Sequence, residues 1–168
     1  MTEQVVLLII LLVLSGFFSS SETALFSISK TKARHIAKEE GKTDILIEGM
    51  KEDPHKLLTT ILIGNNVVNV GAAALATSIA MGIIPNFAVG VATGVMTFLV
   101  LVFGEVLPKS MATRNNIIVA RITIYPIYWL SILFYPFIVI LNFIPKITGR
   151  IKKTPAATEA ELRTFAEV

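Results

Sequence analysis

The positions of the positive charges constrain this chain more than any other feature. All fifteen Lys and Arg residues lie in three tracts, at residues 30–56, 109–121 and 146–163, and each tract borders a long apolar run. Because the cytoplasmic loops of membrane proteins collect Lys and Arg, this distribution predicts an integral membrane protein with all three tracts on the cytoplasmic side. The uncharged break at residues 81–86 is then expected to face outside.

Composition supports the same class of protein. Hydrophobic residues make up 54% of the chain, charged residues 16%, and the mean hydropathy is +0.72, values that exclude an ordinary soluble domain. The basic residues flank apolar runs and alternate with acids, so the expected partner is the lipid bilayer with its anionic headgroups, not nucleic acid. The chain has no cysteine, which excludes disulfides and thiolate metal sites.

Three apolar runs are long enough to cross a membrane, at residues 5–28, 57–80 and 87–107. A bilayer core about 30 Å thick needs about 20 helical residues. The first run has no preceding positive charge and is too long for a cleaved signal sequence, so we expect it to stay attached. Three crossings predict a multi-pass protein of the inner or plasma membrane, with its amino terminus outside and its carboxyl terminus in the cytoplasm.

A fourth apolar stretch, at residues 117–145, conflicts with this topology, because a crossing would place the third basic tract outside. Prolines at positions 126, 136 and 145 are expected to cut it into pieces of about nine residues, each about half a membrane thickness long. We therefore predict a proline-broken, re-entrant hairpin on the cytoplasmic side. The alternative is a kinked full span, since membrane helices tolerate proline.

The remaining segments are expected to be cytoplasmic. The connector at residues 30–54 alternates charged and apolar residues, which predicts one or two amphipathic helices interrupted at Gly41, as a solvated link or as a lipid-contacting element. Residues 154–168 carry a helix-start pattern and are expected to lead into a cytoplasmic domain of a longer protein. The predicted fold is therefore an all-α transmembrane domain at residues 1–153, with three spans and a juxtamembrane helical belt.

Polar residues inside the first span need partners. Ser15, Ser19 and Glu22 share one face of a regular helix. Successive hydroxyls at residues 19–21 can also bond back to the helix, so we expect an irregular backbone there. For the serines alone, packing against neighbouring helices is the simpler interpretation.

The second span carries Asn65 and Asn69 one helical turn apart. Amides inside a membrane are costly unless they are paired. A hydrogen-bonded helix interface and a bound ion would each satisfy them, and this span alone does not favour one over the other.

The third span contains Gly104, Glu105 and Pro108. Pro108 has no N–H to bond the carbonyl of Gly104 four residues earlier, so that oxygen is left free beside the Glu105 carboxylate. A charge near the membrane centre costs about 2.5 to 3.5 kcal/mol on insertion scales. A bound cation would satisfy both groups, and the alternative is a proline kink in which Glu105 pairs with Lys109 or extends to the membrane surface.

Together the three spans offer hydroxyl, amide, carbonyl and carboxylate oxygens, and they contain no cysteine and no histidine. Such hard ligands suit Mg²⁺ or Ca²⁺, and Ca²⁺ would take more carboxylates, so the sequence predicts a Mg²⁺ site between the helices. Alternating access needs a central site whose helices can rearrange. The candidate bending points are Gly16, Gly64, Gly104 and Pro108. Small residues at 71–76 and 90–94 can serve either a dimer contact or packing within one subunit.

Three motifs occur in fixed order: FSSSETAL at residues 18–25, GNNVVN at 64–69 and FGEVLPK at 103–109. Together they resemble the membrane domain of the cyclin M (CNNM)/CorC magnesium transporters, over about residues 7–150. The resemblance implies a homodimer with three transmembrane helices, a cytoplasm-side helical belt and Mg²⁺ bound between the helices. It also implies that a nucleotide-binding CBS pair lies beyond this chain and that nucleotide acts only through it.

The resemblance also assigns the cation site by position. The implied ligands are Ser19 and Ser21 in the first motif, Asn65 and Asn69 in the second, and Gly104 with Glu105 in the third. Glu22 is a weaker candidate, because eukaryotic members carry asparagine there, and its charge leaves room for a second cation such as Na⁺. The family implies Mg²⁺ export, with Glu105 as the principal charged ligand.

Two other function classes compete with a transporter that has no catalytic role. A membrane anchor or scaffold for a cytoplasmic regulatory domain would explain the serines and asparagines. It does not explain why the Glu105 carboxylate lies inside a membrane span. A membrane enzyme could use Glu105 with His35 or His55. Both histidines lie in the connector, away from the predicted site, and we expect them to be exposed and not to bind metal.

Overall fold

The computed structural model describes residues 2–38 and 41–147, and all regular structure in these ranges is helical. The predicted helix start at residues 154–168 lies outside the described residues. The chain divides into two compact units, residues 1–138 and 139–168, and the architecture below is that of the first unit.

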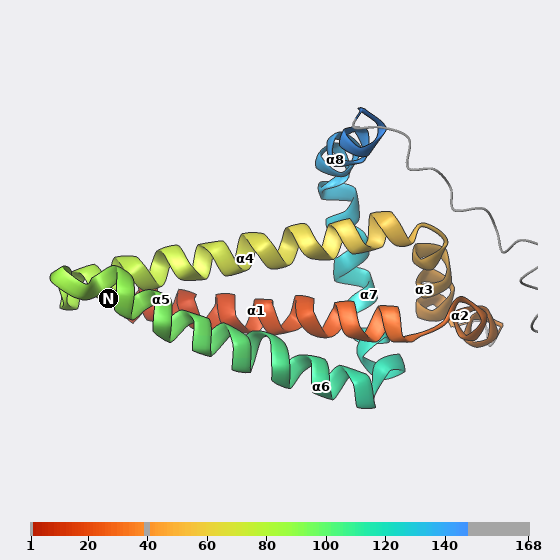
Figure 1. Ribbon diagram of the computed structural model, residues 1–168. Helices are drawn as coiled ribbons and strands as arrows, with labels where there is room; N and C mark the ends of the chain where they lie inside the picture. The colour runs from red at the N-terminus through yellow and green to blue at the C-terminus, as the bar shows by residue number, and fades with distance from the viewer. Residues whose placement is uncertain (1, 39–40, 148–168) are drawn as a thin grey trace, which may run out of the picture. The chain divides into compact units, whose positions relative to one another are not determined.

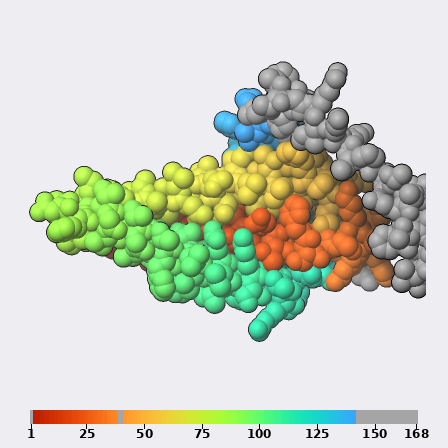
Figure 2. All heavy atoms as spheres, in the orientation of Figure 1, coloured from red at the N-terminus to blue at the C-terminus, as the bar shows by residue number. Residues whose placement is uncertain are grey.

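Three long helical rods lie side by side in this unit (Figure 1). The first is α1 (Thr2–Ser27), the second is α4 (Pro54–Ile83), and the third runs over Pro85–Arg114. In the space-filling view, α1 is visible between the other two (Figure 2). At 1.5 Å per residue the rods are about 39 to 45 Å long, more than the hydrocarbon core requires. The three predicted spans are confirmed as helices, each longer than predicted.

The third rod is a series of helical segments and not one uniform helix. It consists of the 3₁₀ turn η1 (Pro85–Phe87), α5 (Ala88–Leu99), the π-helix η2 (Val100–Val106) and α6 (Leu107–Arg114). The helical rod continues to Arg114, seven residues beyond the predicted end of the span at residue 107. Pro108 is the second residue of α6, but α6 continues η2 with helical backbone angles at Val106 and Leu107, so the missing N–H leaves a carbonyl of η2 without this donor.

The connector forms two short helices, α2 (Lys30–Ala37) and α3 (Lys42–Glu52). Ser29 caps α2 by accepting a hydrogen bond from the Lys32 N–H at 3.1 Å. Each helix buries one apolar face, with Ala33 in α2 and Ile47 in α3 almost inaccessible to solvent. The amphipathic connector and its interruption at Gly41, which precedes α3, are confirmed.

The fourth apolar stretch folds differently from the prediction. It forms α7 (Asn116–Leu133) and α8 (Tyr135–Ile147), which are separated only at Phe134. Pro126 lies inside α7 and does not break it, because the neighbouring side chains of Ile124 and Ile127 are fully buried and their packing maintains the helix. One break was correctly predicted, but the half-membrane pieces of about nine residues were not.

By length and hydropathy alone, four helices of the described chain could cross a membrane: α1, α4, the third rod and α7. The contacts of α7 distinguish it from the other three. It lies across α1 and α4 near the ends that adjoin the connector, and it also contacts α3 (Figure 1). Its buried residues join those of α1, α3 and α4 in one apolar core. We define α2, α3 and α7, which gather at this end of the rods, as the belt.

Charged groups also hold the belt together. The Arg121 guanidinium of α7 binds both carboxylate oxygens of Asp44 in α3, at 2.8 and 2.9 Å, and Asp44 is only 4% exposed. Lys51 of α3 donates a hydrogen bond to the Leu25 carbonyl near the end of α1, at 2.5 Å. Burial, with a smaller contribution from the positive charge of Lys30, lowers the pKa of Lys51.

Candidate metal site

The π-helix η2 places Glu105 on the inner face of the third rod. Leu107 closes it by donating its N–H to the Val102 carbonyl, five residues earlier. An irregularity near Gly104 and Pro108 was predicted as a bend with one free carbonyl, and the structure instead spreads it over a wider helical turn. Such π segments occur often at functional sites because they redirect side chains.

Close contact between η2 and α1 explains Gly104. A Cβ atom at this position would lie 2.5 Å from the Ser15 hydroxyl of α1, so only glycine fits. Gly64 of α4 is equally restricted, because a Cβ there would overlap the Phe18 ring. Both glycines, predicted as bending points, are positions where the rods approach closely. α1 itself is an unbroken α-helix, so the irregular backbone predicted at residues 19–21 was wrong.

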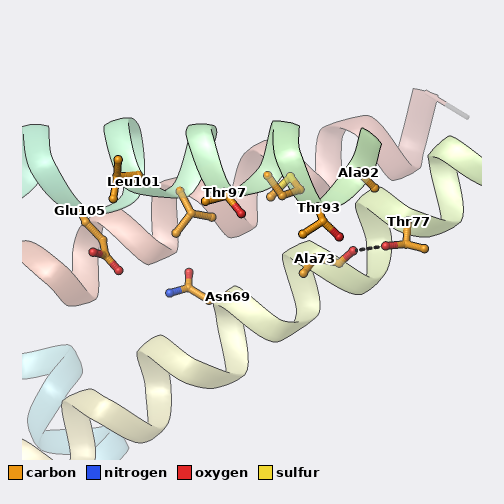
Figure 3. A pocket seen from close by; sticks show the side chains of 10 residues that line it. Asn69, Ala73, Thr77, Ala92, Thr93, Thr97, Leu101 and Glu105 are labelled. Atoms are coloured by element: carbon orange, nitrogen blue, oxygen red, sulfur yellow. Dashed lines mark hydrogen bonds between the residues drawn. The ribbon is translucent and has the colours of Figure 1, made fainter. Parts of the chain in front are cut away.

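Glu105 and Asn69 extend toward one another across the space between η2 and α4 (Figure 3). They line a pocket of about 330 Å³ whose other walls are mainly small or hydroxyl-bearing residues of α4 and α5. The structure therefore brings together the carboxylate of the third motif and one amide of the second motif.

The Glu105 carboxylate has neither a salt bridge nor a hydrogen bond with any other described residue. The sequence alternative paired it with Lys109. In the structure, Lys109 instead lies 3.4 Å from the Glu22 carboxylate of α1. This pairing also gives Glu22 a structural partner outside the pocket. Glu105 is thus left facing Asn69 with no cation from the protein beside it.

Three buried oxygen atoms of the described residues near this region also have no hydrogen-bond partner. Within the described chain, the hydroxyls of Ser15 and Ser19 and the amide oxygen of Asn69 have no hydrogen-bond partner. Most buried polar groups in proteins are paired, so three such atoms on facing helices need an explanation. Metal coordination or water would satisfy them.

The other predicted ligands are placed less favourably. Ser21 is fully buried, and its hydroxyl donates to the Phe17 carbonyl at 2.6 Å. Asn65 accepts a hydrogen bond from the Asn69 amide nitrogen at 3.4 Å, a contact that leaves the Asn69 amide oxygen available. Neither Ser19, Ser21 nor Asn65 lines the pocket of Glu105. The structure brings the three motifs onto adjoining helices but not into one completed ligand shell.

Sequence reasoning did not assign a site role to Ser15, Thr93 or Thr97. Ser15 contacts Gly104, and the two threonines line the pocket with Glu105. The sequence carries little signal for the threonines, because twelve residues of a regular α-helix rotate a side chain by about 120°, so Thr93 would not share the face of Glu105. The wider turn of η2 brings these residues into line with it.

The histidines lie away from the pocket. His35 is exposed in α2, and His55 at the start of α4 is within 3.1 Å of the Thr59 hydroxyl. In the described ranges, no three His, Asp or Glu side chains are grouped closely enough to hold a metal ion. A cation in the pocket would therefore depend on Glu105 together with neutral oxygens.

Comparison with known proteins agrees with the resemblance drawn from the three sequence motifs. A model of the cyclin M transmembrane N-terminal domain matches residues 6–168. A chloroplastic DUF21 domain-containing protein of Arabidopsis thaliana is 39% identical over 166 residues, which cover 96% of this chain and 25% of that protein. The UPF0053 inner membrane protein YfjD of Escherichia coli is 38% identical over 159 residues, covering 90% of this chain and 37% of that protein.

A more distant relative shows the same partial coverage. A UPF0053 protein of Synechocystis is 28% identical over 166 residues, which cover 99% of this chain and 48% of that protein. The chain spans a quarter to about half the length of these relatives.

Proposed function

The chain belongs to the cyclin M (CNNM) family of membrane proteins, and on that premise we propose that it carries Mg²⁺ across a membrane through the helix bundle. The observation that carries the proposal is the unpaired Glu105 carboxylate, which faces Asn69 at the π-helix. A carboxylate in this position needs a counter-charge, and Lys109, one helical turn further along the rod, is paired with Glu22.

The chemistry of the available donors favours Mg²⁺. The pocket offers one carboxylate and an unpaired amide oxygen, with unpaired serine hydroxyls on the adjoining helix. These are hard oxygen ligands, and one or two carboxylates with retained water suit Mg²⁺ better than Ca²⁺, which takes more ligands. Glu105 would be the principal charged ligand, and Asn69 the neutral ligand closest to it.

The remaining ligands belong to a rearranged state of the bundle. Ser19, Asn65 and the Gly104 carbonyl lie on the rods next to the pocket, and small movements of α1 and α4 against η2 would redirect them. Ser21 would first have to release the Phe17 carbonyl. We propose that these groups replace part of the Mg²⁺ water shell when the site closes, as alternating access requires.

Several further properties are part of the proposal. The amino terminus lies outside and the belt in the cytoplasm, because Lys and Arg gather at the belt end. The transporter acts as a homodimer in the cell membrane and exports Mg²⁺, with Na⁺ as a candidate coupling ion. Nucleotide would act only through the cytoplasmic part that is expected beyond this chain.

The test is Mg²⁺ flux in liposomes that contain the full-length parent protein. Glu105→Gln keeps the side-chain volume and removes the charge, and the matched control is Glu22→Gln, which removes the carboxylate that pairs with Lys109. We expect Glu105→Gln to lower flux by about 100-fold or more, because a unit charge beside the ion is worth several kcal/mol at an effective dielectric constant near 20.

The control should retain most of the flux, since the Glu22 pair is partly exposed and contributes little. Equal, undetectable flux in the parent and both variants would favour the alternative of a membrane anchor for a cytoplasmic regulatory domain.

A further inference from the structure

Two columns of residues face each other beyond Glu105. On the third rod, Thr93, Thr97 and Leu101 precede Glu105 at intervals of four residues. On α4, Asn69 and Thr77 lie eight residues apart with Ala73 between them. All line the same pocket, and Figure 3 shows the threonine side chains of both helices along its length.

The hydroxyls of Thr93 and Thr97 differ from those of three other threonines in the rods. Thr60, Thr77 and Thr113 each donate to the carbonyl four residues earlier, at 2.7, 2.9 and 2.8 Å, as threonines in membrane helices commonly do. Neither Thr93 nor Thr97 makes a hydrogen bond with a described residue. Both hydroxyls lie in the pocket of Glu105, whose length along the rods we call the groove. Two unpaired hydroxyls in a groove between membrane helices indicate contact with water or an ion.

The direction of the groove follows from the chain. Thr93 lies twelve residues before Glu105, or about 18 Å along the rod at 1.5 Å per residue, which is roughly half of a bilayer core. The groove therefore leads from Glu105 toward the turn at residues 84–87. Residues 57–108 contain no Lys or Arg, so this end is the one expected outside.

We propose that the groove lined by Thr93 and Thr97 is the outer half of the ion pathway and takes a partly hydrated divalent cation between Glu105 and the outer side. The inference rests on the transport function proposed above. Neutral hydroxyls can replace contacts to the water shell without holding the ion as tightly as a carboxylate, which is what passage requires. Since Thr93 and Ala73 are exposed, the groove needs a side wall in the bilayer, which the second copy of a homodimer would supply.

The first test asks whether the groove contains water, and it does not depend on transport. Because the chain has no cysteine, Thr93→Cys and Thr97→Cys introduce single thiols. The control is Phe98→Cys in the same helix, where the native side chain is 63% exposed but does not line the pocket. A charged, membrane-impermeant thiol reagent is added to vesicles from either side.

We expect both groove cysteines to react from the side opposite the belt, with Thr93→Cys the faster. Phe98→Cys should react at least about ten times more slowly than the groove cysteines, because a thiol surrounded by hydrocarbon does not ionise. Groove cysteines that react no faster than Phe98→Cys, or only from the belt side, would overturn the proposal.

The second test separates passage from binding. Thr93→Val and Thr97→Val remove a hydroxyl at nearly constant volume, and Thr113→Val is the control in the same rod outside the pocket. The double groove variant should lower Mg²⁺ flux by about tenfold, the effect of losing one or two polar contacts to an ion. Its Mg²⁺ affinity in calorimetry should change by less than about twofold, because Glu105 is distant.

Undiminished flux in the double variant would overturn the pathway even if the cysteines react. Absence of Mg²⁺ flux in the parent protein would instead contradict the proposed function, and the two failures are therefore distinguishable.

Discussion

The belt and the middle of the bundle differ in whether their buried polar groups have partners. In the belt, Asp44 binds Arg121 through two hydrogen bonds, and Lys51 donates to the Leu25 carbonyl. In the bundle, the Glu105 carboxylate and the Ser19 hydroxyl have no partner among the described residues. Buried polar groups that stabilise a fold are paired, so the difference separates a structural region from a region available to a ligand.

The largest stability effect should come from breaking the belt ion pair. Asp44→Ala removes two charge-assisted hydrogen bonds between the buried Asp44 carboxylate and the partly exposed Arg121, and we expect the free energy of unfolding to fall by about 3 kcal/mol. Equilibrium unfolding in detergent micelles measures it. Glu52→Ala is the control, because it removes an exposed acid from the same helix and should change stability by less than about 0.5 kcal/mol. Equal stability of the two variants would contradict the structural role of this pair.

A slightly smaller effect is expected where α1 and α4 are in closest contact. Gly64→Ala inserts a methyl group against the Phe18 ring, and overpacking of this kind costs about 2 kcal/mol. Gly49→Ala is a suitable control, because a Cβ there has no neighbour within 4 Å. If the thermal midpoint of Gly64→Ala matches that of the parent, the rods are not packed as described.

Lys51 should give an intermediate effect with a characteristic pH dependence. Its pKa is lowered from the ordinary 10.5, so below that pH there is a window in which the unfolded chain binds the proton and the folded chain does not. Stability therefore rises with pH across that window. Lys51→Met should lose about 1 kcal/mol with the hydrogen bond to Leu25, and it should also lose this rise.

Unfolding measured at several pH values below 10.5 tests the Lys51 prediction. Lys42→Met, at an exposed position in the same helix, should keep the slope of the parent. A Lys51→Met variant with the parental slope would assign the pH dependence to another group.

The smallest stability effect is expected at an unpaired hydroxyl. Ser19→Ala removes an oxygen that has no partner to lose, and the free energy of unfolding should change by less than about 0.5 kcal/mol. Ser131→Ala is the matched change in the belt, where the hydroxyl donates to the Tyr128 carbonyl at 2.7 Å, and it should cost about 1 kcal/mol. The reverse order would remove the distinction between the two regions.

The sequence predicts the long rods because the length of an apolar run and the positions of charges are local properties. It fails at Pro126, where the rule that proline breaks helices is also local, but burial of Ile124 and Ile127 maintains the helix. Helix boundaries in the third rod were missed for a similar reason, since the π-helix depends on how η2 packs against Ser15.

Part of the candidate site follows from the cost of polar groups in lipid, which drew attention to Glu105 and to the pair Asn65 and Asn69 without a structure. Whether Glu105 pairs with Lys109 did not follow from the sequence. It required the position of Lys109 relative to Glu22, which depends on how two helices are rotated against each other. The roles of Ser21 and Thr97 depend on the same rotation and became visible only in three dimensions.

The central claim is that the unpaired carboxylate of Glu105 is where a divalent cation binds. Calorimetric titration of Mg²⁺ into this chain in detergent tests it directly, with Glu105→Gln and Glu22→Gln as the compared variants. The account predicts Mg²⁺ binding that survives Glu22→Gln and weakens by about 100-fold or more in Glu105→Gln, because the charge beside the ion is lost. Mg²⁺ affinity that is unchanged in Glu105→Gln would contradict it.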